Sequence, residues 1–129
     1  MDSQTDQRYR IQVSAVSQPV PEQSDPAAGT YVFAYTITIS NLGLVAAKLL
    51  DRHWIVTDAD GKTQEVRGAG VVGEQPHLQP GESYRYTSGT QISTPVGTMH
   101  GRYGMLADDG IRFEAEIPAF SLGDRSRFH

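Results

Sequence analysis

The sequence predicts an all-β protein: an immunoglobulin-like or fibronectin type III-like sandwich of two antiparallel sheets with about seven strands. Three observations lead to this fold class. Apolar and polar residues alternate with a period of two through most of the chain, which is typical of half-buried strands. Turn signals containing glycine or proline separate these short runs, and none of the runs has a helical period. The 129 residues, 38% of them hydrophobic, are enough for one hydrophobic core.

The first three strands are predicted over residues 9–15, 31–40 and 48–58. The first presents the apolar side chains of residues 9, 11, 13 and 15 on one face. A loop follows over residues 17–29, because this stretch contains three prolines. The second strand is the clearest, since its aromatic and β-branched residues alternate with small or hydroxyl-bearing ones.

The remaining four strands are predicted between clear turn signals. Asp60-Gly61 and Asp109-Gly110 are typical of tight hairpins, and Pro80-Gly81 is typical of a turn. The strands they delimit are expected over 63–67, 83–87, 99–105 and 111–117. We expect residues 68–79 to be irregular and Pro118 to end the last strand. Seven strands of this kind would form one sheet of three and one of four.

The strand over 48–58 contains an inconsistency. Strict alternation places Leu50, Arg52, Trp54 and Val56 on one face, with Leu49 on the other. Trp54 is expected to pack in the core, the alternative being a partner contact. A charged Arg52 on the same face requires either a bulge in the strand or a position of Arg52 at the sheet edge.

Composition and charge exclude several classes of function. The chain has no Cys, which rules out disulfides and thiolate metal sites. Its net charge is −4 and no Lys/Arg run is present, so we expect no nucleic-acid or membrane partner. The polar start lacks a signal-peptide pattern, which predicts a cytoplasmic protein. We expect one domain over 1–129, with an ordered core at about 8–122 and flexible ends, and leave its oligomeric state open.

Gly68, Gly70 and Gly73 match the G-x-G-x-x-G pattern of pyrophosphate-binding loops. That pattern requires a helix directly after it, and here the prolines at 76 and 80 prevent one. We therefore interpret the three glycines as structural, in a loop that needs positive φ or close backbone approach. The alternative is an anion-binding loop without a helix, acting as a phosphate or nucleotide sensor.

No catalytic or metal site is predicted. The four histidines lack metal-ligand spacing, and Asp51 with His53 would supply only two ligands. Thr87 and Ser88 have no nearby base or nucleophile-elbow motif. Glu114 and Glu116 share a strand face, which is typical of a solvated surface. We therefore expect no enzyme activity, no metal and no cofactor.

Several longer segments resemble the ApaG family. They are Leu49 to Ala59, Gly68 to Pro76, Pro80 to Glu82, Tyr86 to Gly89, Thr94 to Met99 and Ile117 to Phe120. The resemblance covers nearly the whole chain. It implies a bacterial protein with a fibronectin type III-like sandwich. It also implies a role in contacts with other proteins, and the family is associated by name with cobalt and magnesium resistance.

Together these observations predict a non-enzymatic module for protein–protein interaction with an unidentified protein partner. It would bind through loops at one end of the sandwich or by strand addition at a sheet edge. Candidate partner contacts are Arg52, His53 and Gln75. The phosphate or nucleotide sensor is the alternative, and a link to cobalt and magnesium could be indirect, through a partner.

Overall fold

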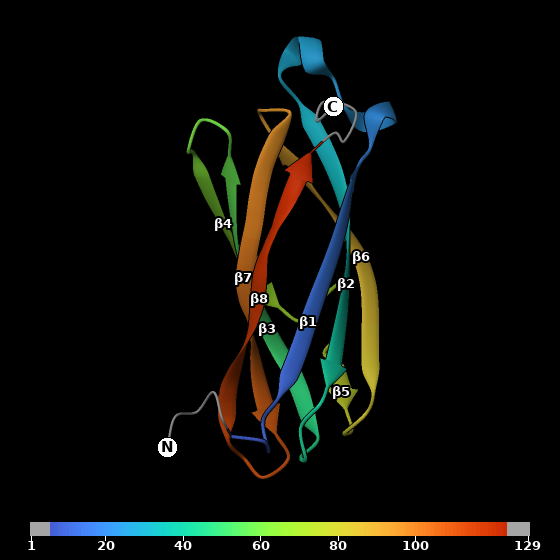
Figure 1. Cartoon of the computed structure of the whole chain (residues 1–129), viewed down its shortest axis with the longest axis vertical. Helices are drawn as coiled ribbons and strands as arrows, with labels where there is room; N and C mark the ends of the chain where they lie inside the picture. The colour runs from blue at the N-terminus through green and yellow to red at the C-terminus, as the bar shows by residue number, and fades with distance from the viewer. Residues whose placement is uncertain (1–5, 124–129) are drawn as a thin grey trace.

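The computed structural model describes residues 6–123, which form two antiparallel sheets packed face to face (Figure 1). The three-stranded sheet has the order β1-β2-β6, with strands Ile11–Pro19, Tyr31–Asn41 and Ser83–Ile92. The second sheet has the order β4-β3-β7-β8, with strands Thr63–Ala69, Ala47–Asp58, Val96–Ala107 and Arg112–Gly123. The predicted sandwich is confirmed.

The structure adds one short strand to the predicted set. β5 (His77–Leu78) pairs with Ala47 and Lys48 of β3, so the sheets have three and five strands rather than three and four. It lies in the stretch that we expected to be irregular, and two residues are too few to show an alternating pattern. Helical structure within residues 6–123 is limited to two 3-10 turns in the proline-rich segment, Pro21–Gln23 and Pro26–Ala28.

The predicted end of the last strand is wrong, because β8 continues past Pro118 to Gly123. The β7–β8 register shifts so that Pro118 and Ala119 together lie opposite His100, which makes a β-bulge. β8 is also an edge strand, and a proline is tolerated at a bulge or on an edge because its missing N–H is not needed there. The limits of β1 and β6 were also misplaced: β1 starts at residue 11 and ends at 19, and β6 runs on to residue 92.

The core lies between the sheets and is filled from both by alternate residues. Trp54 is only 2% exposed and packs edge-on against Tyr35, Tyr103 and Phe120, with ring centroids 5.3, 6.4 and 5.9 Å away. The prediction that Trp54 is a core residue is therefore confirmed. Edge-on aromatic pairs of this kind add to the stabilisation from burial alone.

A bulge in β3 changes the face of Leu49 but leaves Arg52 on the face of Trp54. Pairing with β7 skips Leu50 between Leu49 and Asp51, so both Leu49 and Trp54 point into the core. The predicted outward position of Leu49 is therefore wrong, and the physical reason is the extra residue. Arg52 stays on the inner face with Trp54 and is half-buried, but it does not lie at a sheet edge, because β4 and β7 pair with it on both sides.

The flexible ends that we predicted at both termini fall largely on residues 1–5 and 124–129, which lie outside the described residues. Within the described part of the chain, no helix is both long enough and apolar enough to cross a membrane.

Candidate functional site

The two sheets meet along two seams, each formed by one edge strand from each sheet. At the front seam β1 and β8 run side by side (Figure 1), and Ser17 Oγ donates a hydrogen bond of 2.5 Å to the Ser121 carbonyl. At the back seam β6 faces β4, and Gln64 Nε2 donates a 3.2 Å hydrogen bond to the Gln91 carbonyl. Below this contact the back seam opens into a cleft.

We call this opening the Arg52 cleft; its volume is about 180 Å³. The five-stranded sheet contributes Arg52 and Trp54 together with aliphatic side chains, and β6 contributes Ser88, Gly89 and Thr90. Ser88 and Thr90 occupy inward positions of β6 that follow Tyr84 and Tyr86 in the alternation. The cleft exists because β6 changes from tyrosines to small side chains at this level of the core.

Arg52 is held in the cleft by main-chain carbonyls. Its NH1 donates to the carbonyls of Ala69 and Gly70, at 3.0 and 2.9 Å. No carboxylate among residues 6–123 lies within ion-pair distance of Arg52. A half-buried guanidinium is therefore present without a counter-charge, which is an uncommon and costly arrangement.

The glycine loop has a structural explanation at each of its three positions. A Cβ on Gly68 would lie only 2.8 Å from the Arg52 guanidinium, so Gly68 lets that group lie flat against β4. Gly70 has φ +62°, and a Cβ there would collide with the Glu74 carbonyl oxygen. Gly73 has φ +82°, a left-handed conformation that favours glycine, with open space around it.

The tip of this loop is a tight two-residue turn. Val71 and Glu74 exchange both backbone hydrogen bonds, at 2.8 and 2.9 Å, and Val72 and Gly73 between them both have positive φ. This is the geometry of a type I′ turn, which is strained at Val72 because its side chain is β-branched. Val71 packs into the core, whereas Val72 is 55% exposed.

The main-chain amides of the loop are mostly occupied. Gly70 N–H donates to the Leu50 carbonyl at 2.9 Å, and the amides of Val71 and Glu74 are used within the turn. A phosphate-binding loop needs several amides that converge on one empty point. The geometry therefore favours the structural interpretation of Gly68, Gly70 and Gly73 over the phosphate alternative.

The structure brings some of the predicted partner contacts together and separates others. Gln75 Nε2 donates to the Leu50 carbonyl at 2.8 Å, so Gln75 and Arg52 both attach the glycine loop to the β3 bulge. His53 points away from the cleft, on the outer face of the sheet. There its Nε2 lies 2.8 Å from Glu65 Oε1, and its Nδ1 is buried without a hydrogen-bond partner among the described residues.

Two tyrosines pack in the core near Arg52. The hydroxyls of Tyr86 and Tyr103 lie 2.6 Å apart and are buried. Burial raises the pKa of Tyr86 to about 12, because the phenolate would lose its solvation there. Burial likewise raises the pKa of Tyr103, and the neighbouring Tyr86 adds to that effect. Both tyrosines are therefore neutral hydrogen-bonding groups in the core.

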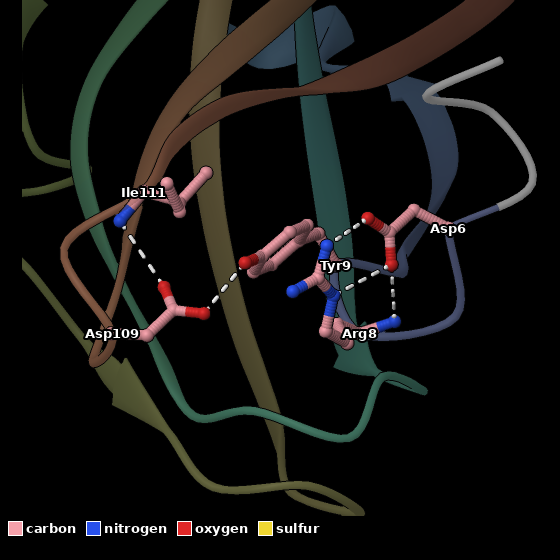
Figure 2. A network of polar contacts seen from close by, with 5 residues as sticks. All are labelled: Asp6, Arg8, Tyr9, Asp109 and Ile111. Carbon is pink, nitrogen blue, oxygen red and sulfur yellow. Dashed lines mark hydrogen bonds and ion pairs between the residues drawn. The ribbon is translucent and has the colours of Figure 1, made fainter. Parts of the chain in front are cut away.

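The front seam is closed at its lower end by a polar network at the surface (Figure 2). Tyr9 donates a 2.5 Å hydrogen bond to Asp109, which also accepts the Ile111 amide at 3.1 Å. Asp6 accepts three hydrogen bonds from Arg8, and the Arg8 guanidinium lies over the Tyr9 ring at 4.9 Å. The hydrogen bond from Arg8 lowers the pKa of Asp6, and the one from Tyr9 lowers the pKa of Asp109.

A groove of about 810 Å³ lies beside this network, between residues 6–11 and the first half of β8. Its acidic and basic side chains are equal in number, three of each: Asp6, Glu114 and Glu116, and Arg8, Arg10 and Arg112. Two of the three carboxylates already have arginine partners, since Asp6 binds Arg8 and Glu114 binds Arg102. Within residues 6–123, no group of three or more metal-ligating side chains is close enough to hold a metal ion.

The comparison with known proteins decides the family. The model of the ApaG domain family matches residues 21–107. This chain belongs to the ApaG family. It is 57% identical over 122 residues to Protein ApaG of Dechloromonas aromatica, covering 95% of this chain and 96% of that protein. It is 62% identical over 114 residues to Protein ApaG of an Azoarcus species, covering 88% and 90% of the two chains.

Solved structures show the same fold for the family. A protein named ApaA from Bordetella pertussis superimposes with a TM-score of 0.89 at 50% identity, covering 92% of this chain and 96% of that one. A second X-ray structure has a TM-score of 0.83 at 53% identity, covering 88% and 86% of the two chains.

Three of the six segments that carry the ApaG resemblance meet at the back seam. Arg52 and Trp54 come from the first segment, the glycine loop is the second, and Ser88 and Gly89 end the fourth. Sequence reasoning selected Arg52 and the glycines but missed that β6 completes the site. The available signal was that the inward positions of β6 change from Tyr84 and Tyr86 to Ser88 and Thr90, since small residues facing a core leave a gap.

Proposed function

We propose that this ApaG domain is a non-enzymatic binding module that takes up an extended segment of a partner protein as an additional strand beside β6. One observation carries the proposal: the outer edge of β6 presents main-chain groups that no part of residues 6–123 covers between Ser83 and Gly89. Such an edge is a template for another strand. Any connection to cobalt or magnesium resistance would then run through the partner.

Two hydrogen bonds establish which groups face that edge. The Asn41 amide donates to the Glu82 carbonyl, so the main-chain groups of even-numbered residues in β6 point toward β2. The Gln91 carbonyl accepts from Gln64 of β4, so those of odd-numbered residues point away from β2. The amides and carbonyls of Ser83, Arg85, Thr87 and Gly89 therefore face the open side.

The other three edges carry features that discourage pairing. β8 has a bulge at Pro118 and alternating charges, and β4 carries Glu65 and Arg67. β1 is covered by β8 along the front seam. β6 has ten residues with neither a proline nor a bulge, and Arg85 is its single charge. Natural proteins protect edge strands with charges, prolines, bulges or covering elements, and β6 has the fewest of these, so it is the edge most open to pairing with another strand.

An added strand would also fill the Arg52 cleft. Residues of that strand opposite Tyr86 and Ser88 would point inward, because cross-strand neighbours share a face. The inward side chain opposite Ser88 would enter the cleft between β6 and β4. Strand addition would thus join a main-chain contact, which gives affinity, to a pocket that selects a side chain.

The test uses peptides of 12 residues selected from a random display library against the whole protein, followed by amide hydrogen exchange. Bound peptide should slow exchange at the amides of Arg85, Thr87 and Gly89. Thr87→Pro should abolish binding, because it removes an edge amide without breaking the β2–β6 ladder. Thr87→Ala, which keeps that amide, is the matched control. Binding that survives Thr87→Pro, or protection elsewhere only, would refute strand addition.

A further inference from the structure

We infer that the Arg52 cleft is a carboxylate-binding site, and that the inward residue of the added strand opposite Ser88 is acidic. The second half of this inference rests on the proposed function. The first half stands on the cleft itself, whatever segment of chain brings the carboxylate there.

The guanidinium of Arg52 has donors to spare. One of its amino groups makes both contacts to the carbonyls of Ala69 and Gly70. No hydrogen bond within residues 6–123 uses the other amino group or Nε. Arginine presents its five N–H donors in a planar fork that matches a carboxylate, and such pairs are among the strongest hydrogen bonds in proteins.

The surroundings of Arg52 favour one carboxylate over a larger anion. Ser88 and Thr90 line the same cleft and can donate hydroxyl hydrogen bonds, while Trp54 and Val66 form apolar walls. The cleft volume of about 180 Å³ is smaller than the roughly 300–1,000 Å³ of typical small-molecule sites. Arg52 is the only basic residue of the lining, so the site balances one negative charge and not the several charges of a nucleotide.

The glycine loop positions the guanidinium for this role. Because Gly68 has no Cβ, the group lies flat against β4, and Gly70 brings its own carbonyl to Arg52 NH1. The two carbonyls are neutral dipoles, so they hold the cation without neutralising it. The loop therefore fixes the orientation of Arg52 and leaves its charge available.

The experiment titrates the whole protein with small probes while NMR follows the Arg52 Nε–H, the Trp54 indole N–H and the Ser88 and Gly89 amides. The probes are N-acetylglutamate N-methylamide, its glutamine isostere and inorganic phosphate. The glutamate probe should shift these signals, and the glutamine probe should not. Arg52→Gln should weaken binding about tenfold, as expected for a lost hydrogen bond to a charged group.

Two further variants separate the possible failures. Ser88→Leu fills the cleft without touching the Arg52–loop contacts, and should abolish probe binding even if Arg52→Gln disturbs folding. Arg85→Gln removes a charge from the outer face and should change nothing. Equal binding of phosphate and the glutamate probe, or binding that survives Ser88→Leu, would overturn the carboxylate site.

The same probes distinguish this inference from the proposed function. Thr87→Pro blocks the edge of β6 but leaves the cleft intact, so it should keep probe binding while losing peptide binding. If peptides bind at β6 but the glutamate probe does not, strand addition stands and the carboxylate site fails. If the glutamate probe binds but no peptide protects the β6 amides, the carboxylate site stands and strand addition fails.

Discussion

The front and back seams join the same two sheets in opposite ways. At the front, side chains complete the junction: Ser17 binds the Ser121 carbonyl and Tyr9 binds Asp109, residues about a hundred positions apart in the chain. At the back, one amide side chain, Gln64, reaches the Gln91 carbonyl, and below it the cleft stays open. One seam uses its polar groups internally, and the other leaves main-chain donors and acceptors and a cation without a counter-charge among residues 6–123.

The difference lies in which residues are small. The open seam places Ser88 and Thr90 where a closed core would have large apolar side chains, and uses Gly68 and Gly70 to hold Arg52. Such choices forgo stabilising burial of about 25 cal/mol per Å². A protein that keeps a gap of this kind beside a free strand edge has the features expected of a binding site rather than of a packing fault.

The largest effect is expected at Trp54, which lines the cleft and packs in the core. Trp54→Ala should lower the free energy of unfolding by about 3–5 kcal/mol, the usual cost of removing a large buried aromatic residue. Denaturant unfolding followed by circular dichroism measures it. A loss below about 1 kcal/mol would mean that the back seam is loose even in its core, and that Trp54 belongs to the contact surface.

The second prediction separates the glycines of the back-seam loop. In Gly70→Ala the new Cβ is strained by the positive φ and also collides with the Glu74 carbonyl. The free energy of unfolding should therefore fall by about 3 kcal/mol, from conformational strain together with overpacking. Gly73→Ala should lower the free energy of unfolding by only about 1–2 kcal/mol, because open space surrounds this position and only the positive φ is unfavourable. Thermal melts of both variants give the order. Equal losses would show that the contact with Glu74 relaxes freely.

The third prediction concerns pH and the core tyrosines. The folded-state pKa values of Tyr86 and Tyr103 are raised above the ordinary value of 10 by burial, Tyr86 to about 12. Their contribution to stability is therefore complete below pH 10 and is lost as pH rises toward and through the folded pKa. Each tyrosine that stays protonated in the folded protein but ionises in the unfolded chain should lower the free energy of unfolding by about 1.4 kcal/mol per pH unit.

Urea unfolding at several pH values between 9 and 12 tests this, with Tyr103→Phe as the comparison. In Tyr103→Phe the free energy of unfolding should fall less steeply with pH, because unfolding releases about one proton fewer. Its lower absolute stability, from leaving the Tyr86 hydroxyl without a partner, does not affect the slope. An unchanged slope would show that Tyr103 ionises in the folded protein as readily as in water.

The sequence was sufficient for the architecture because the architecture depends on local patterns. The alternation of Phe33, Tyr35, Ile37 and Ile39 marks a strand wherever it occurs, and Asp60-Gly61 specifies a hairpin from two residues alone. The charged Arg52 beside Trp54 predicted that β3 would bulge or place Arg52 at an edge, and β3 does bulge, although Arg52 itself is paired on both sides. Pro118 misled because a single residue cannot reveal whether its strand is central or at an edge.

The candidate site was only half predictable, since it forms where distant strands meet. Arg52 and the glycines could be selected as unusual residues, but Ser88 and Thr90, which complete the cleft, lie in the other sheet. His53, next to Arg52 in sequence, lies on the opposite face. The contact between Tyr9 and Asp109 left no sequence signal, because two ordinary polar residues become informative only when the fold places them together.

The smallest effect is expected at the front seam. Tyr9→Phe removes the hydrogen bond to Asp109 but keeps the ring, which packs at a tilt of 33° against Phe113 with centroids 5.3 Å apart. Because this hydrogen bond is exposed to solvent, the midpoint of thermal unfolding should not change measurably. Instead, the amides of residues 8–10 should exchange faster with solvent than in the unmodified protein, since their attachment to the β7–β8 hairpin is gone.

The pH dependence of this exchange identifies the contact responsible. The Tyr9 hydroxyl lowers the pKa of Asp109, so the stabilisation is present above about pH 4 and is lost as pH falls through the lowered value. Acid should therefore loosen residues 8–10 in the unmodified protein and add little in Tyr9→Phe. The ion pair of Asp6 with Arg8 titrates alike in both proteins, so the difference between them isolates Asp109. Amides on β6 should respond to neither change. If Tyr9→Phe alters exchange at Thr87 or Gly89, the two seams are coupled through the core, and the separation of a closed front from an open back is wrong.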